Sequence, residues 1–268
     1  MWAIGFQGAN PAYPDRAARP AVPLTAVGLL DRARELGIHL VQTGPNLPVD
    51  RLPEPELERF IQAARDWDIT LELGTRGLDR DHLIRQIALA KSMGATLIRT
   101  LPEIGGQYAR DARQLLPVLA ELQPVLEPHG IRLAIETGRL PAAELKAVLD
   151  QVNSPLIGVV LDTVNSLAVP EGWKDVARTL APHTMCLHYK DFVIKRAWHM
   201  MGFICEGTPS GEGQVDTRWL LDTLKVSPYY FNVIIELWPP EQATLDDTVR
   251  LEQQWAEKSV PYLRQYIP

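Results

Sequence analysis

The sequence predicts an α/β fold, a single (β/α)8 barrel that spans the whole chain of 268 residues. Short apolar runs alternate with amphipathic segments of helical length, and this alternation repeats along the chain without an intervening linker. The runs are apolar almost throughout, which is typical of parallel strands buried on both faces. Such a series of units predicts a parallel sheet with right-handed crossovers, closed into a barrel.

Eight strands and eight helices are expected in alternation. The expected strands are Ala3–Gln7, Leu40–Thr43, Thr70–Gly74, Leu97–Leu101, Arg132–Glu136, Ile157–Asp162, Met185–Tyr189 and Val233–Leu237. The expected helices are Leu24–Leu36, Glu54–Asp66, Asp81–Met93, Ala109–Pro128, Pro141–Val152, Trp173–Leu180, Thr217–Leu224 and Leu245–Tyr266. Proline interrupts two of these helical patterns, so a bend is expected near Pro124 and a kink or split at Pro261.

An open, doubly wound sheet is the alternative fold. No Gly-x-Gly-x-x-Gly fingerprint of dinucleotide-binding sheets follows the first strand, and Gly5 and Gly8 do not form one. No Gly-rich phosphate-binding loop ending in Lys-Ser/Thr occurs either. The longest irregular stretch, Asp191–Asp216, is expected to be an active-site lid and not a domain boundary.

Composition argues against two classes of partner. The net charge of -6 and the pI of about 5.6 make a polyphosphate ligand unfavourable, so no nucleic acid is expected. No apolar run approaches the roughly 18 residues that cross a bilayer, so no membrane partner is expected. No secretory pattern is present at the start of the sequence, and the two cysteines, Cys186 and Cys205, are expected to be reduced thiols in a cytoplasmic protein.

Four polar side chains end consecutive strands in the second half of the chain. Glu136, Asp162, His188 and Glu236 each stand near the end of an apolar run. The carboxyl ends of the strands meet on one face of such a barrel, where the chemistry takes place. Converging carboxylates repel one another and are costly to bury, and a divalent cation removes both costs. We therefore expect these four residues to bind one metal ion.

Three oxygen donors and one imidazole form a hard, mixed ligand set. Mn²⁺ is the ion expected first, with Mg²⁺, Co²⁺ or Zn²⁺ as alternatives. Taken singly, each residue is more often a helix cap or a salt-bridge partner, and Asp162 before Thr163 is such a cap candidate. Four of them at successive strand ends favour the metal site.

Five segments carry a resemblance to a known superfamily. They are Ala134–Gly138 (A-I-E-T-G), Val159–Ser166 (V-V-L-D-T-V-N-S), Leu187–Phe192 (L-H-Y-K-D-F), Gly211–Asp216 (G-E-G-Q-V-D) and Ile234–Trp238 (I-I-E-L-W). The sequence resembles the xylose-isomerase-like TIM-barrel superfamily, which includes sugar-phosphate isomerases and epimerases, inosose dehydratases and endonuclease IV. The resemblance implies that Glu136, Asp162, His188 and Glu236 match the ligands of its single-metal site, with the two glutamates also acting as acid and base.

One position departs from the epimerase pattern. The epimerases usually carry a second histidine three residues after the metal-binding aspartate, and Asn165 stands there in this chain. The segment around Asn165, together with His-Tyr-Lys-Asp-Phe, looks more like members that act on oxidised sugar acids or 3-keto sugars. The additional histidines of the three-zinc endonuclease IV site are missing from the motifs, so DNA repair is not expected.

Further polar residues are candidates for catalysis and substrate binding. Lys190 lies two residues after His188 on the same side of the strand, so it could stabilise an enolate oxygen or bind a carboxylate, or else pair with Asp191 in solvent. Glu72 is expected to be an acid/base or a partner of Arg99. The candidates for substrate contacts are Gln42, Arg99, Asn165, Arg196, His199 and Trp238.

Three functions remain open. The first is a metal-dependent sugar isomerase or epimerase, in which Glu136 or Glu236 takes a proton next to a carbonyl and a metal-stabilised enediolate results. The second is a lyase or decarboxylase that reaches the same enolate from a 3-keto sugar or an oxidised sugar acid, as Asn165 and Lys190 suggest. The third is a non-catalytic sugar-binding barrel or an accessory subunit. The expected ligand is a small sugar, keto sugar or sugar acid, and apolar residues at 198–203 leave a homo-oligomer open.

Overall fold

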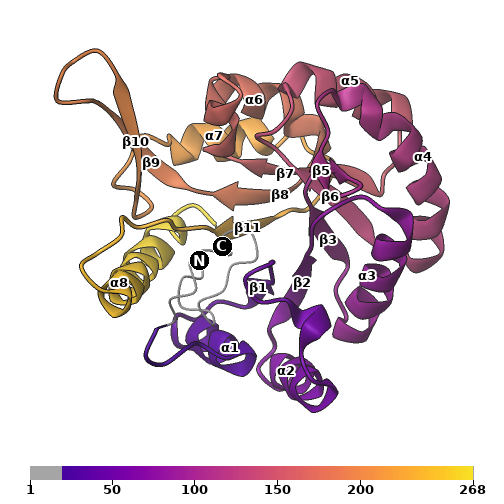
Figure 1. Cartoon of the computed structure of the whole chain (residues 1–268), viewed down its shortest axis with the longest axis horizontal. Helices are drawn as coiled ribbons and strands as arrows, with labels where there is room; N and C mark the ends of the chain where they lie inside the picture. Colours follow the sequence, from indigo (N-terminus) through magenta and orange to yellow (C-terminus); the bar gives the residue numbers. More distant parts are fainter. Residues whose placement is uncertain (1–19, 268) are drawn as a thin grey trace.

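The computed structural model of the protein describes residues 20–267, so the expected strand Ala3–Gln7 lies outside the described residues. Seven parallel strands form one curved sheet, and helices surround it on the outside (Figure 1). The strands are, in their order across the sheet, β1 (Leu40–Gln42), β2 (Thr70–Gly74), β3 (Leu97–Thr100), β6 (Arg132–Glu136), β7 (Ile157–Asp162), β8 (Thr184–Tyr189) and β11 (Asn232–Ile235).

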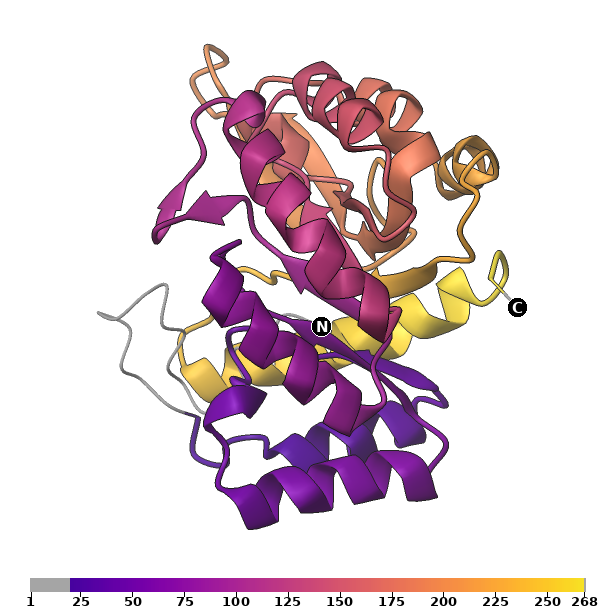
Figure 2. The ribbon, with the colours of Figure 1, turned by 90° about the vertical axis from the view of Figure 1, so that its right-hand side faces the viewer.

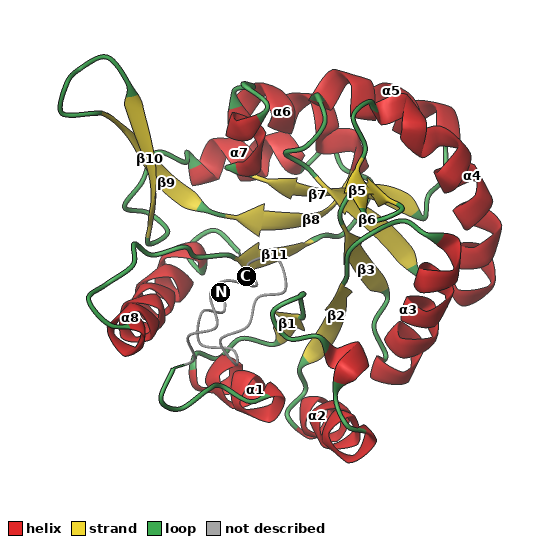
Figure 3. Cartoon of the chain, viewed as in Figure 1, coloured by secondary structure: helices red, strands yellow, loops and turns green. Residues whose placement is uncertain are grey.

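The strand order confirms the barrel. Each of these strands pairs in parallel with the preceding one along the chain, whereas a doubly wound sheet reverses its order at a switch point. The sheet curves so far that its edge strands, β1 and β11, approach each other on the same side of the molecule (Figure 3). The described part of the chain is therefore a nearly closed α/β barrel.

In the described part of the chain, eight α-helices form the outer layer, which Figure 2 shows from the side. They are α1 (Ala26–Glu35), α2 (Glu54–Asp66), α3 (Arg80–Met93), α4 (Leu115–Leu126), α5 (Ala142–Val152), α6 (Trp173–Leu180), α7 (Thr217–Leu224) and α8 (Leu245–Leu263). Local sequence sets several of their ends: the Thr25 side chain accepts from the Gly28 N–H at the start of α1, and Gly94 ends α3 in the left-handed region. No helix among residues 20–267 is long and apolar enough to cross a membrane.

Three expectations about the elements were wrong. The expected helix Ala109–Pro128 begins too early, because its first residues follow a small hairpin of β4 (Glu103–Ile104) and β5 (Gln107–Tyr108), only a short 3-10 turn forms at Ala112–Gln114, and α4 begins at Leu115. Pro261 does not split α8, since it lies in the last turn of the helix, where few backbone bonds depend on it. The segment from Asp191 to Asp216 is not irregular.

That segment forms a second hairpin. Strands β9 (Asp191–Arg196) and β10 (Phe203–Thr208) pair antiparallel, and the hairpin projects away from the barrel (Figure 1). Asp191 anchors its base, because this buried carboxylate accepts hydrogen bonds from the backbone N–H groups of Gly211, Gly213 and Val215. A Cβ on Gly213 would lie 2.1 Å from the Asp191 carboxylate, so glycine is required for this approach.

The barrel interior changes from apolar to polar along the strands. Leu97, Ala134, Val160 and Cys186 are fully buried and pack together in the interior. Two residues later on each strand, the same side carries Arg99, Glu136, Asp162 and His188, because side chains alternate between the two faces of a sheet. The interior at the carboxyl end of the barrel is therefore a cluster of charged and hydrogen-bonding groups.

Candidate metal centre

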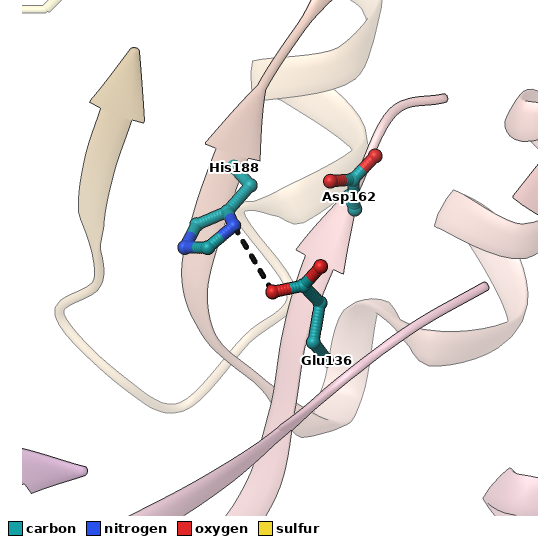
Figure 4. Close-up of side chains that lie close together, drawn as sticks. All are labelled: Glu136, Asp162 and His188. Carbon is teal, nitrogen blue, oxygen red and sulfur yellow. Dashed lines mark ion pairs between the residues drawn. The ribbon is translucent and has the colours of Figure 1, made fainter. Parts of the chain in front are cut away.

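Four strand ends bring the acidic cluster together. Glu136 and Asp162 end β6 and β7, His188 lies on β8 directly opposite Asp162, and Glu236 follows β11. One donor atom from each of Glu136, Asp162 and His188 lies within 4.8 Å of the others, and all three side chains are buried (Figure 4). The Glu236 Oε2 atom lies 3.3 Å from His188 Nδ1, so the fourth expected ligand joins the group.

A hydrogen bond from Gln42 fixes the orientation of the His188 ring. His188 Nε2 lies 2.7 Å from Gln42 Oε1, and an amide oxygen only accepts, so Nε2 carries the proton. The Gln42 amide is itself oriented, because its Nε2 donates to Glu72 Oε2 at 2.8 Å. His188 Nδ1 therefore presents a lone pair toward the carboxylates, as a metal-binding imidazole does.

Asp162 uses its two oxygens differently. Its Oδ1 accepts from the backbone N–H groups of Val164 and Asn165, each at 2.8 Å, which fixes the carboxylate at the end of β7. Its Oδ2 faces the cluster without a well-directed hydrogen bond among the described residues. Glu136 is held on both sides, by Arg99 at Oε2 and by the Asn165 amide at Oε1, the latter at 2.7 Å.

The donor set fits a divalent cation. Asp162 Oδ2, His188 Nδ1 and Glu236 Oε2 are buried atoms. The two carboxylate oxygens lie against the ammonium group of Lys190 without a well-directed hydrogen bond, and His188 Nδ1 has no hydrogen-bond partner in the described part of the chain. An imidazole lone pair 3.3–3.4 Å from two carboxylate oxygens is repelled by both of them. A cation between these atoms replaces the repulsion with attraction and satisfies all three, so the residues suit a hard divalent ion.

Two basic side chains also enter the cluster. Lys190 Nζ lies 2.7 Å from both Asp162 Oδ2 and Glu236 Oε2, and Arg99 pairs with Glu136. Burial opposes the charge on Lys190, but the neighbouring carboxylates outweigh it and raise the pKa of Lys190 above its ordinary value. Burial likewise acts against ionisation of Glu236, yet the neighbouring charge of Lys190 holds the pKa of Glu236 well below its usual range. Lys190 is thus a buried cation inside the acidic cluster and not a solvated partner of Asp191.

Behind the cluster lies a partly buried chain of hydrogen bonds. It runs from His188 through Gln42 to Glu72, and Glu72 Oε1 accepts from the Asn232 amide at 2.6 Å. The expected pairing of Glu72 with Arg99 was wrong, because Arg99 reaches across to Glu136 on the next strand. Gln42 contacts His188, a candidate metal ligand, directly, so it serves to position the His188 ring.

The other expected substrate contacts fall in different places. Asn165 lies in the cluster, where it also accepts from Lys190 Nζ at 3.2 Å. Arg196 and His199 belong to the β9–β10 hairpin, where the Arg196 side chain stacks over Phe203 and donates a hydrogen bond to the backbone carbonyl of Met200. Trp238 packs against Gly207 at the base of the same hairpin. Thus the structure brings Asn165 to the centre, but not Arg196, His199 or Trp238.

The cavity above the centre is lined by residues that the sequence reasoning missed. Arg76, Tyr108 and Arg139 line it together with Glu136, His188 and Lys190. Arg76 and Arg139 lie in loops just beyond β2 and β6, and Tyr108 ends the short strand β5. No alternation of polar and apolar residues marks these positions, and their place after expected strands was the only signal in the sequence.

These features define the class of protein, an α/β barrel with a candidate divalent-metal centre at the carboxyl ends of its strands. The family model described as xylose isomerase-like TIM barrel matches residues 69–259. The chain therefore belongs to the xylose isomerase-like TIM-barrel family, as the sequence motifs predicted. It is an enzyme-type barrel of this superfamily.

The individual relatives of the chain include proteins with different named activities. A 3-oxo-isoapionate decarboxylase of Pectobacterium atrosepticum is 33% identical over 248 residues, covering 92% of this chain and 90% of the relative. A xylose isomerase-like barrel protein of Mycobacterium smegmatis in complex with magnesium superimposes with a TM-score of 0.69 at 16% identity, covering 89% of this chain and 87% of that chain. A D-psicose 3-epimerase gives a TM-score of 0.66 at 16% identity, covering 90% and 92%. At such identities the two structures show the shared fold alone.

Proposed function

We propose that the protein is a divalent-metal-dependent lyase that removes CO₂ from a 3-oxo sugar acid. The likeness to a 3-oxo-isoapionate decarboxylase over nearly the whole chain supports this reaction class. The arrangement of Glu136 supports it independently. Both oxygens of Glu136 are engaged, one by Arg99 and one by Asn165, so this carboxylate is poorly placed to carry a proton.

Glu136, Asp162, His188 and Glu236 would hold the ion, with His188 binding through Nδ1. When bound, the ion acts as a Lewis acid toward the substrate carbonyl and favours the enolate that forms next to it. Gln42 keeps the His188 lone pair directed at the cluster, and Arg99 keeps the Glu136 carboxylate in place. This chain thereby supplies a fixed site of mixed charge in a buried pocket, where electrostatic stabilisation is strongest.

Lys190 is the proposed catalytic residue for the carbon–carbon step. The bond between the carboxylate carbon and its neighbour breaks, its electron pair moves toward the carbonyl oxygen, and CO₂ leaves. Lys190 carries a positive charge and N–H donors next to Asp162 and Glu236, so it can stabilise the developing oxyanion and return one proton to the carbon. Solvent then restores the proton of Lys190. Acid help of this kind contributes about 10²–10⁴-fold.

The test is turnover of a 3-oxo sugar acid by Mn²⁺-loaded protein in D₂O. The proposal expects release of CO₂ and one deuterium on the product carbon, with none in unreacted substrate. Lys190→Met should retain Mn²⁺ and lose most of the CO₂ release. Deuterium that enters unreacted substrate without CO₂ release would instead identify an isomerase or epimerase.

An epimerase is the second candidate because Glu236 reaches the cluster from the strand end opposite Glu136, as an acid/base pair requires. The structural likeness to a D-psicose 3-epimerase is compatible with it but carries the fold alone. Glu236→Gln decides between the two. An epimerase needs Glu236 for proton transfer, so its exchange activity should collapse even when Mn²⁺ remains bound. In the lyase, the loss of CO₂ release should follow the loss of Mn²⁺ affinity.

A further inference from the structure

Arg139 lies at the mouth of the cavity that contains the candidate metal centre. It follows β6 by three residues and lines the same cavity as Glu136 and Lys190. Three residues of chain span at most about 10 Å, a distance that an arginine side chain and a small sugar acid bridge together. The side chain is exposed at the entrance and not buried in the barrel wall.

Within the described residues 20–267, no carboxylate compensates the charge of Arg139. The other cations at this end of the cavity have carboxylate partners: Arg76 pairs with Glu103 at 2.5 Å, Arg99 with Glu136, and Lys190 with Asp162. Arg139 forms no ion pair with any carboxylate among residues 20–267. An anionic ligand entering this end of the cavity therefore meets one guanidinium group that is free to pair with it.

Tyr108 holds the guanidinium group in a defined orientation. The Arg139 Cζ atom lies over the Tyr108 ring, 4.3 Å from its centroid. Stacking covers one face of the planar group and leaves the N–H donors on its edge available for two parallel hydrogen bonds. Arg76 Nη2 donates to the Tyr108 hydroxyl oxygen at 3.4 Å, so the hydroxyl hydrogen remains available to a ligand as well.

The backbone before Arg139 is fixed. Gly138 has a φ of +105°, and a Cβ at this position would lie 2.2 Å from the Cβ of Asn165. Because Gly138 is wedged against the residue that bonds Glu136, the start of the Arg139 side chain cannot shift relative to the centre. Arg139 is thus positioned as firmly as the loop allows, although its tip is exposed.

We propose that Arg139, together with the Tyr108 hydroxyl, binds the anionic group of the substrate and makes the site selective for acids over neutral sugars. This rests on the proposed function for the location of the substrate in the cavity. In a decarboxylation the anionic group is lost as CO₂, so Arg139 distinguishes the charged substrate from the neutral product and aids product release. Its loss should raise KM more than it lowers kcat. A carboxylate and a phosphate ester share this chemistry.

Binding of unreactive ligands tests the proposal without relying on turnover. Mn²⁺-loaded protein is titrated calorimetrically with gluconate, with neutral glucitol and with glucitol 6-phosphate. Wild-type protein should bind an anionic probe at least about 10-fold more tightly than glucitol, as charge-assisted hydrogen bonds predict. Preference for gluconate identifies a carboxylate site, and preference for the phosphate ester a phosphate site.

Arg139→Gln should bring the affinity for the anionic probe down to that for glucitol, while the Mn²⁺ affinity and the melting temperature stay unchanged. Arg218→Gln is the matched control, because Arg218 also stacks over a tyrosine, Tyr266, but lies outside the cavity lining. Equal binding of gluconate and glucitol by wild-type protein, or unchanged anion affinity in Arg139→Gln, would overturn the proposal. Failure of the CO₂ assay with the anion preference intact would reject the reaction and leave this site standing.

Discussion

Replacing Gln42 with leucine probes the hydrogen bond that orients the His188 ring. The change removes the acceptor at 2.7 Å from His188 Nε2 and the donor at 2.8 Å from Glu72 Oε2. Loss of such an outer partner typically weakens metal binding 10- to 100-fold, or about 1.4–2.7 kcal/mol. Each buried group left unpaired costs a further ~1–3 kcal/mol of folding free energy in the metal-free protein.

Calorimetric titration with Mn²⁺ measures the first effect, and urea unfolding without metal measures the second. Gln86→Leu is the matched control, since Gln86 is buried and its amide likewise donates to a carboxylate, Asp50, at 3.3 Å, away from the centre. The control should lose stability and keep its Mn²⁺ affinity. If Gln42→Leu bound Mn²⁺ as tightly as wild-type protein, the inferred orientation of His188 would be refuted.

Three further outcomes are expected. Lys190→Met should destabilise the metal-free protein by roughly 3–5 kcal/mol in urea unfolding, because the two carboxylates lose their cationic partner. The same variant should bind Mn²⁺ with a lower Kd, because the ammonium group no longer competes with the ion for these carboxylates. A higher Kd would contradict this. Gly138→Ala should lower the free energy of unfolding by about 2 kcal/mol or more, because the new Cβ would clash with Asn165. Gly130→Ala is the control: Gly130 has a φ of +62° but open space around it, so the loss should be only about 1–2 kcal/mol. Equal losses in the two variants would contradict the predicted clash. Adding Mn²⁺ at about 100 times its Kd to chelator-treated protein should stabilise the folded state by ~2.7 kcal/mol, which is measured as a rise in melting temperature. The Asp162→Asn variant should show no such rise.

The fold could be predicted because buried parallel strands leave a strong signal. Continuous apolar runs such as Ile157–Asp162 and the glycine that ends α3 mark their elements locally. The hairpins β4–β5 and β9–β10 could not be predicted in the same way. Their strands are short or largely exposed and project from the barrel, so no pattern of burial records them.

The candidate site was predictable where the barrel geometry alone determines it. Strand alternation brings Glu136, Asp162 and His188 to one face at one height. The role of Gln42 could not be foreseen, because its partner His188 is far away in sequence and only the curvature of the sheet brings them together. Arg139 was missed for a different reason. It lies close to Glu136 in sequence, but in a loop, where residue spacing does not indicate which way a side chain points.

The central claim is that Glu136, Asp162, His188 and Glu236 bind one divalent ion. Anomalous diffraction from crystals of Mn²⁺-treated protein tests it most directly. One manganese peak is expected at bonding distance from His188 Nδ1 and from the three carboxylates, with Lys190 Nζ moved off Asp162 Oδ2. Absence of a peak there, with Lys190 still between Asp162 and Glu236, would contradict it.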